Sequence, residues 1–166
     1  MTKLLPLLIV VILILSVGVF FSGTTELNTK QPIEFSHKKH RDIELPCSVC
    51  HQYFEEHASA GIPGGEICMT CHTVALTQNP EEEKIREYAN QGLEIKWVRL
   101  YRVPNHVYFS HRRHVVLGKL ECTTCHGGIG ESIKPPLGPE VELTMDTCIA
   151  CHQKMGADTD CYACHR

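Results

Sequence analysis

Residues 47–51 read Cys-Ser-Val-Cys-His, two cysteines three positions apart with a histidine directly after them. The pattern occurs four more times, so all ten cysteines of the 166-residue chain fall in five Cys-x-x-Cys-His motifs. Their cysteines are Cys47 and Cys50, Cys68 and Cys71, Cys122 and Cys125, Cys148 and Cys151, and Cys161 and Cys164. The histidines that follow the pairs are His51, His72, His126, His152 and His165.

Cys-x-x-Cys-His is the attachment signature of c-type haem. Two thiols at this spacing can form thioethers to the two vinyl groups on one edge of a porphyrin, and the adjacent imidazole can then bind the iron from one side. The sequence therefore predicts five haem c groups. The ten cysteines are the predicted attachment sites, and the five motif histidines are the predicted proximal ligands of the iron.

Three other uses of paired cysteines explain the pattern less well. Disulfides suit an exported protein but do not account for a histidine after every pair. A zinc ribbon is a closer rival, because 17 residues separate Cys50 from Cys68; four-ligand zinc sites, however, leave one of five pairs unmatched. A thioredoxin-like redox pair needs a βαβ context that this sequence lacks.

The composition predicts a domain whose interior is made largely of haem. Five haems in about 140 residues leave fewer than about 30 residues for each, too few for an aliphatic core. We expect a small, mostly α-helical and irregular domain over residues 26–166, with little β structure. Lys and Arg number 16 against 19 Asp and Glu, which excludes the basic stripe of a nucleic-acid binder.

Six of the eleven histidines lie outside the motifs: His37, His40, His57, His106, His111 and His114. A haem iron with one proximal histidine has one axial position left, so we expect five of these six to be distal ligands. Iron with two protein ligands has no position for a substrate, which favours electron transfer over catalysis.

An internal repeat supports this expectation. The sequence FSHKKH at residues 35–40 recurs as FSHRRH at residues 109–114, so the chain contains two related halves, about residues 33–78 and 105–166. The serine of each copy can cap a short helix. Histidines three positions apart on that helix cannot easily bind one iron from opposite faces, so each copy is expected to reach two haems.

The order of the chain suggests which distal histidine serves which haem. We expect His37 at the first haem, His57 at the second and His111 at the third, with His40, His106 and His114 competing for the last two. Met145 and Met155 flank the fourth motif and are the alternative axial ligands.

Between the second and third motifs, residues 79–92 carry signals for a helix. Asn79 is a good N-cap, Pro80 suits the first helical position, and Gly92 ends the helix. Glu82 stands three residues after Asn79, which predicts a capping box.

The N-terminal segment is apolar. Residues 4–21 are eighteen positions without a charge, and a helix of this length covers roughly 27 Å, close to the hydrocarbon thickness of a bilayer. We expect residues 1–25 to anchor the chain as a single-pass protein of the cytoplasmic membrane. Lys3 places the N-terminus in the cytoplasm and the haem domain on the periplasmic side. A cleaved signal peptide is the alternative, and it exports the same domain.

The order of FSHKKH, CSVCH, AGIPGGEICMTCH, KWVRLYRVPNHVYFSHRRH, CTTCHGGIGE and LTMDTCIACH resembles the class III-type multihaem cytochromes c, especially the pentahaem subunit of alternative complex III. That resemblance implies an electron-transfer subunit, not an enzyme on its own, within a menaquinol-oxidising respiratory or photosynthetic complex. It also implies other subunits of that complex as partners and a periplasmic electron carrier or oxidase as acceptor. The alternatives are another type of anchored multihaem quinol dehydrogenase and a multihaem reductase with an open iron.

Overall fold

A computed structural model describes residues 30–165. Its helical elements are α2 (His37–Arg41), α3 (Cys47–Cys50), α4 (Gly65–Met69), α5 (Pro80–Asn90), the π-helical turn η1 (Arg112–Leu117), α6 (Thr123–His126), the 3₁₀ turn η2 (Ile129–Glu131), α7 (Met145–Met155) and α8 (Cys161–Cys164). These residues contain no strand, only an isolated antiparallel bridge between Val107 and His165. The prediction of a small, mostly helical and irregular fold with little β structure is confirmed.

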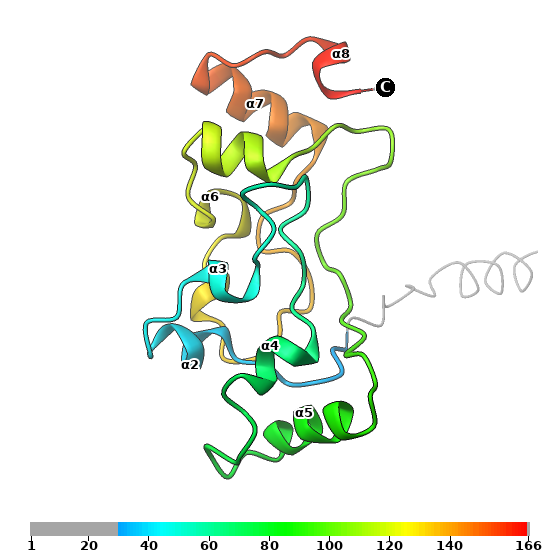
Figure 1. Ribbon diagram of the computed structural model, residues 1–166. Coiled ribbons are helices and arrows are strands. Elements are labelled where there is room, and N and C mark those ends of the chain that lie inside the picture. The colour runs from blue at the N-terminus through cyan, green and yellow to red at the C-terminus, as the bar shows by residue number, and fades with distance from the viewer. Residues whose placement is uncertain (1–29, 166) are drawn as a thin grey trace, which may run out of the picture.

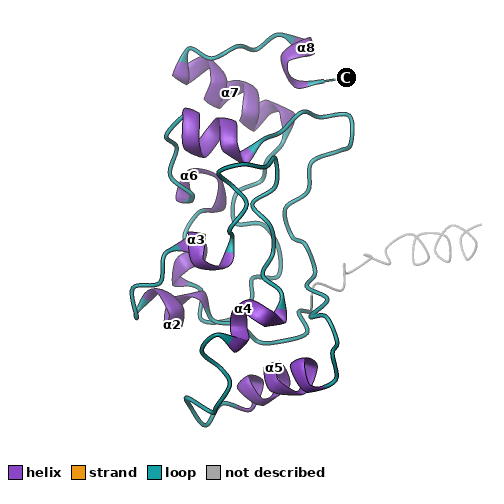
Figure 2. Ribbon diagram, viewed as in Figure 1, coloured by secondary structure: helices purple, strands orange, loops and turns teal. Residues whose placement is uncertain are grey.

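The helices are arranged along an elongated molecule (Figure 1). Helix α5 lies at one end with α4 next to it, α2, α3 and α6 lie in the middle, and α7 and α8 lie at the other end. Residues 93–111 run along much of this length between the α5 end and the α7 end. Figure 2 shows that loops connect these short helices over most of the chain. The most extensive contacts between helical elements are those of α4 with α5 and of α2 with η2.

The polypeptide buries very little apolar surface. Ile33, Ile85 and Ile95 are the buried hydrophobic side chains in residues 30–165, and Met69 and Trp97 pack against them. No large side chain of this region is fully buried, and many large hydrophobic ones are exposed. A domain of this size ordinarily buries far more of its own side chains, so the protein alone does not form a sufficient core.

Helix α5 begins as its sequence predicts. The Asn79 side chain accepts a hydrogen bond of 3.0 Å from the backbone N–H two residues on, and Pro80 takes the first helical position. The predicted capping box is wrong. The Glu82 carboxylate does not bond the Asn79 N–H, because it accepts hydrogen bonds from the backbone N–H groups of Leu76 and Thr77 instead.

Over residues 30–165 no helix is long and apolar enough to cross a bilayer, since α5 and α7 have only 11 residues each. The predicted localisation, a single-pass protein of the cytoplasmic membrane with its haem domain on the periplasmic side, is therefore corrected. Residues 1–25, to which that prediction assigned the span, lie outside the described residues.

Candidate haem-iron sites

Each Cys-x-x-Cys pair lies on or at the end of a short helix. Helices α3 and α8 consist of a pair alone, while α7 carries the fourth pair within its length. One helical turn places positions i and i+3 on the same side, as attachment to one porphyrin edge requires. None of the ten cysteines, all of which lie within residues 30–165, is joined in a disulfide. The described residues offer no group of three or more side chains suited to a metal ion, so the zinc alternative finds no four-ligand site there.

Backbone carbonyls orient the motif histidines at two sites. Nδ1 of His51 lies 2.8 Å from the carbonyl oxygen of Gly61, and Nδ1 of His152 lies 2.6 Å from that of Asp158. A carbonyl can only accept a hydrogen bond, so Nδ1 carries the proton and Nε2 keeps the lone pair that a metal needs. The two rings are therefore prepared to bind iron through Nε2.

A second histidine faces the motif histidine at four of the five motifs. The ring centres are separated by 6.2 Å for His40 and His72, 6.3 Å for His111 and His126, 6.1 Å for His114 and His152, and 5.5 Å for His106 and His165. A metal–imidazole bond is about 2 Å long, so two imidazoles on opposite sides of one metal ion have centres roughly 6 Å apart. The observed spacings fit that arrangement.

At the first motif, His37 on α2 is the histidine close enough to His51 to interact with it electrostatically. Burial, then the nearby His51 and His40, lower the pKa of His37 to about 4. The imidazole is therefore neutral at physiological pH, which is the form that binds a metal. Its Nδ1 lies 3.2 Å from Oγ of Ser132, a contact that ties α2 to the loop after the third motif.

The two copies of Phe-Ser-His-x-x-His share one local geometry. Phe35 stacks on the second histidine of its copy, His40, at 4.5 Å and meets the first histidine edge-on at 4.8 Å. Phe109 does the same in its copy, stacking on His114 at 4.8 Å and meeting the first histidine edge-on at 4.9 Å. The two histidines of a copy are thus held in different planes, and in the second copy His111 and His114 face different motif histidines.

Three predicted candidates lie away from these pairs. The ring of His57 meets Tyr53 edge-on at 5.7 Å, and it is His40 that lies beside His72. The side chains of Met145 and Met155 are 61% and 58% exposed. The structure therefore places His40, where the order of the chain suggested His57, at the second motif.

The second motif histidine has an unusual neighbour that the sequence did not reveal. Nδ1 of His72 is buried without a hydrogen bond, and Oε1 of Glu82 lies 3.7 Å from it. Burial raises the pKa of the Glu82 carboxyl, but hydrogen bonds from Thr77 and Leu76, with His72 nearby, outweigh it and hold the pKa below its usual range. The carboxylate is therefore ionised at neutral pH. Its place in the sequence suggested a helix cap and a pairing with Arg86 four residues on, but no contact with His72.

Tyr101, an aromatic residue expected from the sequence to pack on a haem, lies beside a motif histidine. Its ring centre lies 4.4 Å from that of His126, and its hydroxyl accepts a hydrogen bond of 3.0 Å from the backbone N–H of Glu140. Burial, then His111 and His51, lower the pKa of His126. His126 thus has neighbours from both halves of the chain and, in Tyr101, from the segment between them.

Neighbouring motifs come close enough for their thiols to interact. Burial raises the pKa values of four motif thiols. In each case a cysteine of a neighbouring motif raises the pKa further. The interacting thiols are Cys68 with Cys50, Cys122 with Cys47, Cys125 with Cys151, and Cys148 with Cys164. The motifs therefore follow one another in space as second, first, third, fourth and fifth, in agreement with the sequence α4, α3, α6, α7 and α8 along Figure 1.

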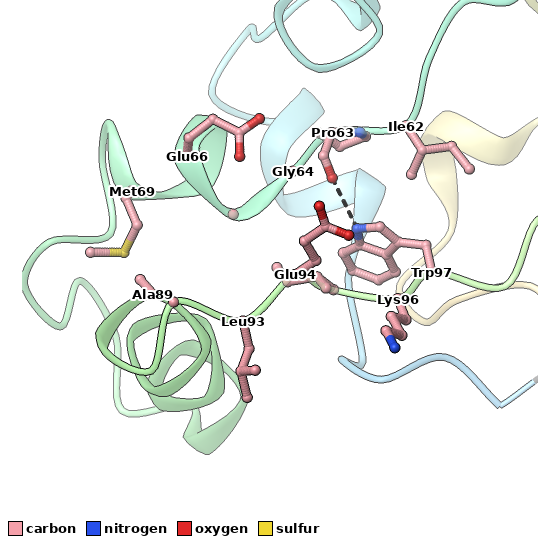
Figure 3. Close-up of a pocket in the computed structure, with 13 residues that line it drawn as sticks. Ile62, Pro63, Gly64, Glu66, Met69, Ala89, Leu93, Glu94, Lys96 and Trp97 are labelled. Carbon is pink, nitrogen blue, oxygen red and sulfur yellow. Dashed lines mark hydrogen bonds between the residues drawn. The ribbon is translucent and has the colours of Figure 1, made fainter.

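An open groove of about 830 Å³ lies between α4, α5 and the segment that follows α5 (Figure 3). Met69, Leu93 and Trp97 are among its lining residues, and the indole Nε1 of Trp97 donates a hydrogen bond of 3.0 Å to the carbonyl of Pro63. No motif cysteine or histidine lines this groove, but Met69 lies between the two cysteines of the second motif, so the groove borders that motif.

Comparison with known proteins gives consistent matches over both halves. The class III cytochrome c family matches residues 21–93, and the family of cytochrome c7 and related cytochromes c matches residues 107–166. The chain is also similar to the multihaem cytochrome c subunit of menaquinone reductase from Nitratidesulfovibrio vulgaris (strain Hildenborough). That match is 32% identical over 162 residues and covers 82% of this chain and 77% of the relative. None of these descriptions names alternative complex III.

Proposed function

We propose that this chain, which belongs to the class III and cytochrome c7 type of multihaem cytochromes c, transfers electrons through five covalently attached haem c groups, one at each Cys-x-x-Cys-His motif. When bound, each haem supplies an iron that accepts and gives up one electron. The observation that carries the proposal is the histidine facing the motif histidine at four motifs, with ring centres 5.5–6.3 Å apart.

The proposed ligands follow from these pairs. The ten motif cysteines attach the haems, and His51, His72, His126, His152 and His165 are the proximal ligands. Their distal partners are, in the same order, His37, His40, His111, His114 and His106. His57 is then the one spare histidine that does not bind iron. Two imidazoles on each iron leave no position for a substrate, which supports a role in electron transfer and not an enzyme acting alone.

The proposed electron path follows the spatial order of the motifs. Helix α2 carries His37 and His40 and so links the first and second sites. His111, directly before η1, and His114, within it, link the third and fourth. Cys47 of the first motif lies close to Cys122 of the third, so the first and third sites are neighbours. The path thus runs from the second motif, near α5, to the fifth, on α8.

We place the chain as the cytochrome subunit of a multi-subunit complex that exchanges electrons with menaquinone. The similar protein from N. vulgaris is named as a subunit of a menaquinone reductase, and alternative complex III, which the sequence resembles, oxidises menaquinol. A chain of haems conducts in either direction, so the potentials of its partners set the direction. The proposed partners are the other subunits of the complex and an electron carrier or oxidase.

The haem content of the chain tests this function. The protein is purified after expression with the cytochrome c maturation system, and its intact mass is compared with haem measured as the pyridine haemochrome. Five haems per chain are expected, with only low-spin ferric signals in low-temperature EPR. Fewer than five haems overturns the assignment of the motifs, and a substantial high-spin signal overturns the proposed distal ligands.

A further inference from the structure

The motif histidines do not all have the same partner for Nδ1. His51 and His152 have backbone carbonyls at 2.8 and 2.6 Å. Nδ1 of His72 has no such partner and faces Oε1 of Glu82 at 3.7 Å. The side chains of His72 and Glu82 are only 16% and 10% exposed, so solvent screens their interaction weakly. A buried imidazole whose Nδ1 faces a buried carboxylate sets the second site apart.

The protein holds the Glu82 carboxylate firmly in this place. Its Oε2 accepts hydrogen bonds of 3.0 Å from the Leu76 N–H and 3.1 Å from the Thr77 N–H, and its Oε1 accepts one of 3.0 Å from the Thr77 hydroxyl. These donors lie in the loop that follows the second motif, while Glu82 itself lies on α5. The carboxylate therefore links the loop after His72 to the helix.

The charge of Glu82 is only partly offset. Nη1 of Arg86 lies 4.0 Å from Oε2 of Glu82 and makes no hydrogen bond. The same guanidinium bonds Glu83 at 2.6 Å through Nη2 and at 3.1 Å through Nε. Arg86 is thus engaged mainly with Glu83, and Glu82 keeps negative charge on the side that faces His72.

We propose that Glu82 is a positioning residue for His72: its carboxylate faces the Nδ1–H of this iron-binding imidazole and lowers the reduction potential of the haem at the second motif. A carboxylate partner makes a histidine ligand more basic. A nearby negative charge also favours ferric over ferrous iron, because the ferric site carries one more positive charge. This inference rests on the proposed function, and it involves only the one-electron reduction of the iron, with no bond formed or broken.

The test compares two substitutions in the full haem-loaded chain, one that removes a negative charge and one that removes a positive charge. Redox titration followed by EPR resolves the low-spin ferric haems. Glu82→Gln is expected to shift the midpoint of one haem to a more positive potential and to change the g values of that haem. Arg86→Gln is expected to shift the same haem to a more negative potential. The responding haem is identified as the one that His40→Ala converts to high-spin.

Glu87→Gln is the matched control, because it removes one charge from an exposed position of the same helix. If Glu82→Gln shifts no midpoint more than Glu87→Gln does, the role of Glu82 is overturned. If Glu82→Gln loses a haem, Glu82→Asp replaces it, since it keeps the charge but withdraws the carboxylate. A smaller positive shift of the same haem is then expected, and no shift overturns the proposal. Failure of the proposed function is distinguishable, because it appears in the unsubstituted protein as missing or high-spin haem.

Discussion

The imidazole rings of His111 and His126 lie within 2° of parallel, with their centres 6.3 Å apart. His111 is also tied to the first half of the chain, because its backbone N–H donates to the carbonyl of Ala58 at 2.9 Å and its Nδ1 lies 2.8 Å from the same oxygen. That carbonyl fixes the proton on Nδ1 and leaves Nε2 turned to a metal. The third site is therefore built by both halves together.

His40→Ala is expected to convert one haem from low-spin to high-spin, because it removes the imidazole that faces His72 at 6.2 Å. His57→Ala is the control, since the ring of His57 contacts Tyr53. Its EPR spectrum should match that of the unsubstituted protein. A high-spin haem produced by His57→Ala, with none produced by His40→Ala, would restore the pairing suggested by the order of the chain.

Replacing Cys161 and Cys164 together by serine is expected to remove one haem and leave four low-spin haems. These cysteines form α8 at the end of the molecule (Figure 1), so the remaining sites should keep their ligands. Within the described residues, the histidines paired at this site, His106 and His165, face no other motif. Intact mass and EPR measure the result, and the loss of two or more haems would show that the fifth motif is not an independent end of the path.

Ser36→Ala is expected to reduce the free energy of unfolding by about 1 kcal/mol, as loss of a helix N-cap does. The Ser36 hydroxyl accepts from the Lys39 N–H at 3.3 Å and contacts the Ser132 carbonyl at 3.4 Å. Ser110→Ala should reduce the free energy of unfolding less, because the matching hydrogen bond, from the Arg113 N–H to the Ser110 hydroxyl, is 3.5 Å long. Denaturant unfolding of the haem-loaded protein measures the free energy of unfolding of both variants. A larger decrease for Ser110→Ala than for Ser36→Ala would contradict this prediction.

Acid should weaken the contact of Glu81 with the segment before α2. Burial raises the pKa of the Glu81 carboxyl, but hydrogen bonds from Lys84 and from the backbone N–H of Glu34 outweigh it and hold the pKa below 4.5. A lowered folded-state pKa stabilises the fold above the unfolded value, and this stability is lost as pH falls through the folded value.

Glu81→Gln should therefore destabilise the protein at neutral pH, and its difference from the unsubstituted protein should shrink as the pH falls below about 4.5. Thermal unfolding midpoints of both proteins across this range measure the difference. A difference that is constant with pH would mean that the ionised carboxylate makes no contribution.

The motif cysteines and histidines can be identified from the sequence alone, whereas the histidines that lie beside them in space cannot. Cys-x-x-Cys-His is a local pattern, because covalent attachment and proximal ligation need residues within a single turn, and all five can be read directly. Distal pairing depends on how the sites are ordered in space. Along the chain, His57 is nearer to the second motif than His40 is. In the folded chain it is His40 that lies beside His72, because the second motif, at α4, lies next to the first motif.

Helix α5 illustrates a second limit. Its ends follow from Asn79, Pro80 and Gly92, because caps and turns depend on nearby residues. The role of Glu82 does not follow from nearby residues alone. Its carboxylate accepts hydrogen bonds from the backbone N–H groups of Leu76 and Thr77, which lie in the preceding loop. A residue that suits a local cap can be recruited by a tertiary contact, and only the folded chain reveals which of the two prevails.

Anomalous diffraction at the iron absorption edge, from crystals of the haem-loaded protein, tests the central claim most directly. Five irons are expected, each between the two imidazoles of one pair: His37 and His51, His40 and His72, His111 and His126, His114 and His152, and His106 and His165. An iron bound only by its motif histidine, or one bound by His57, would contradict the account.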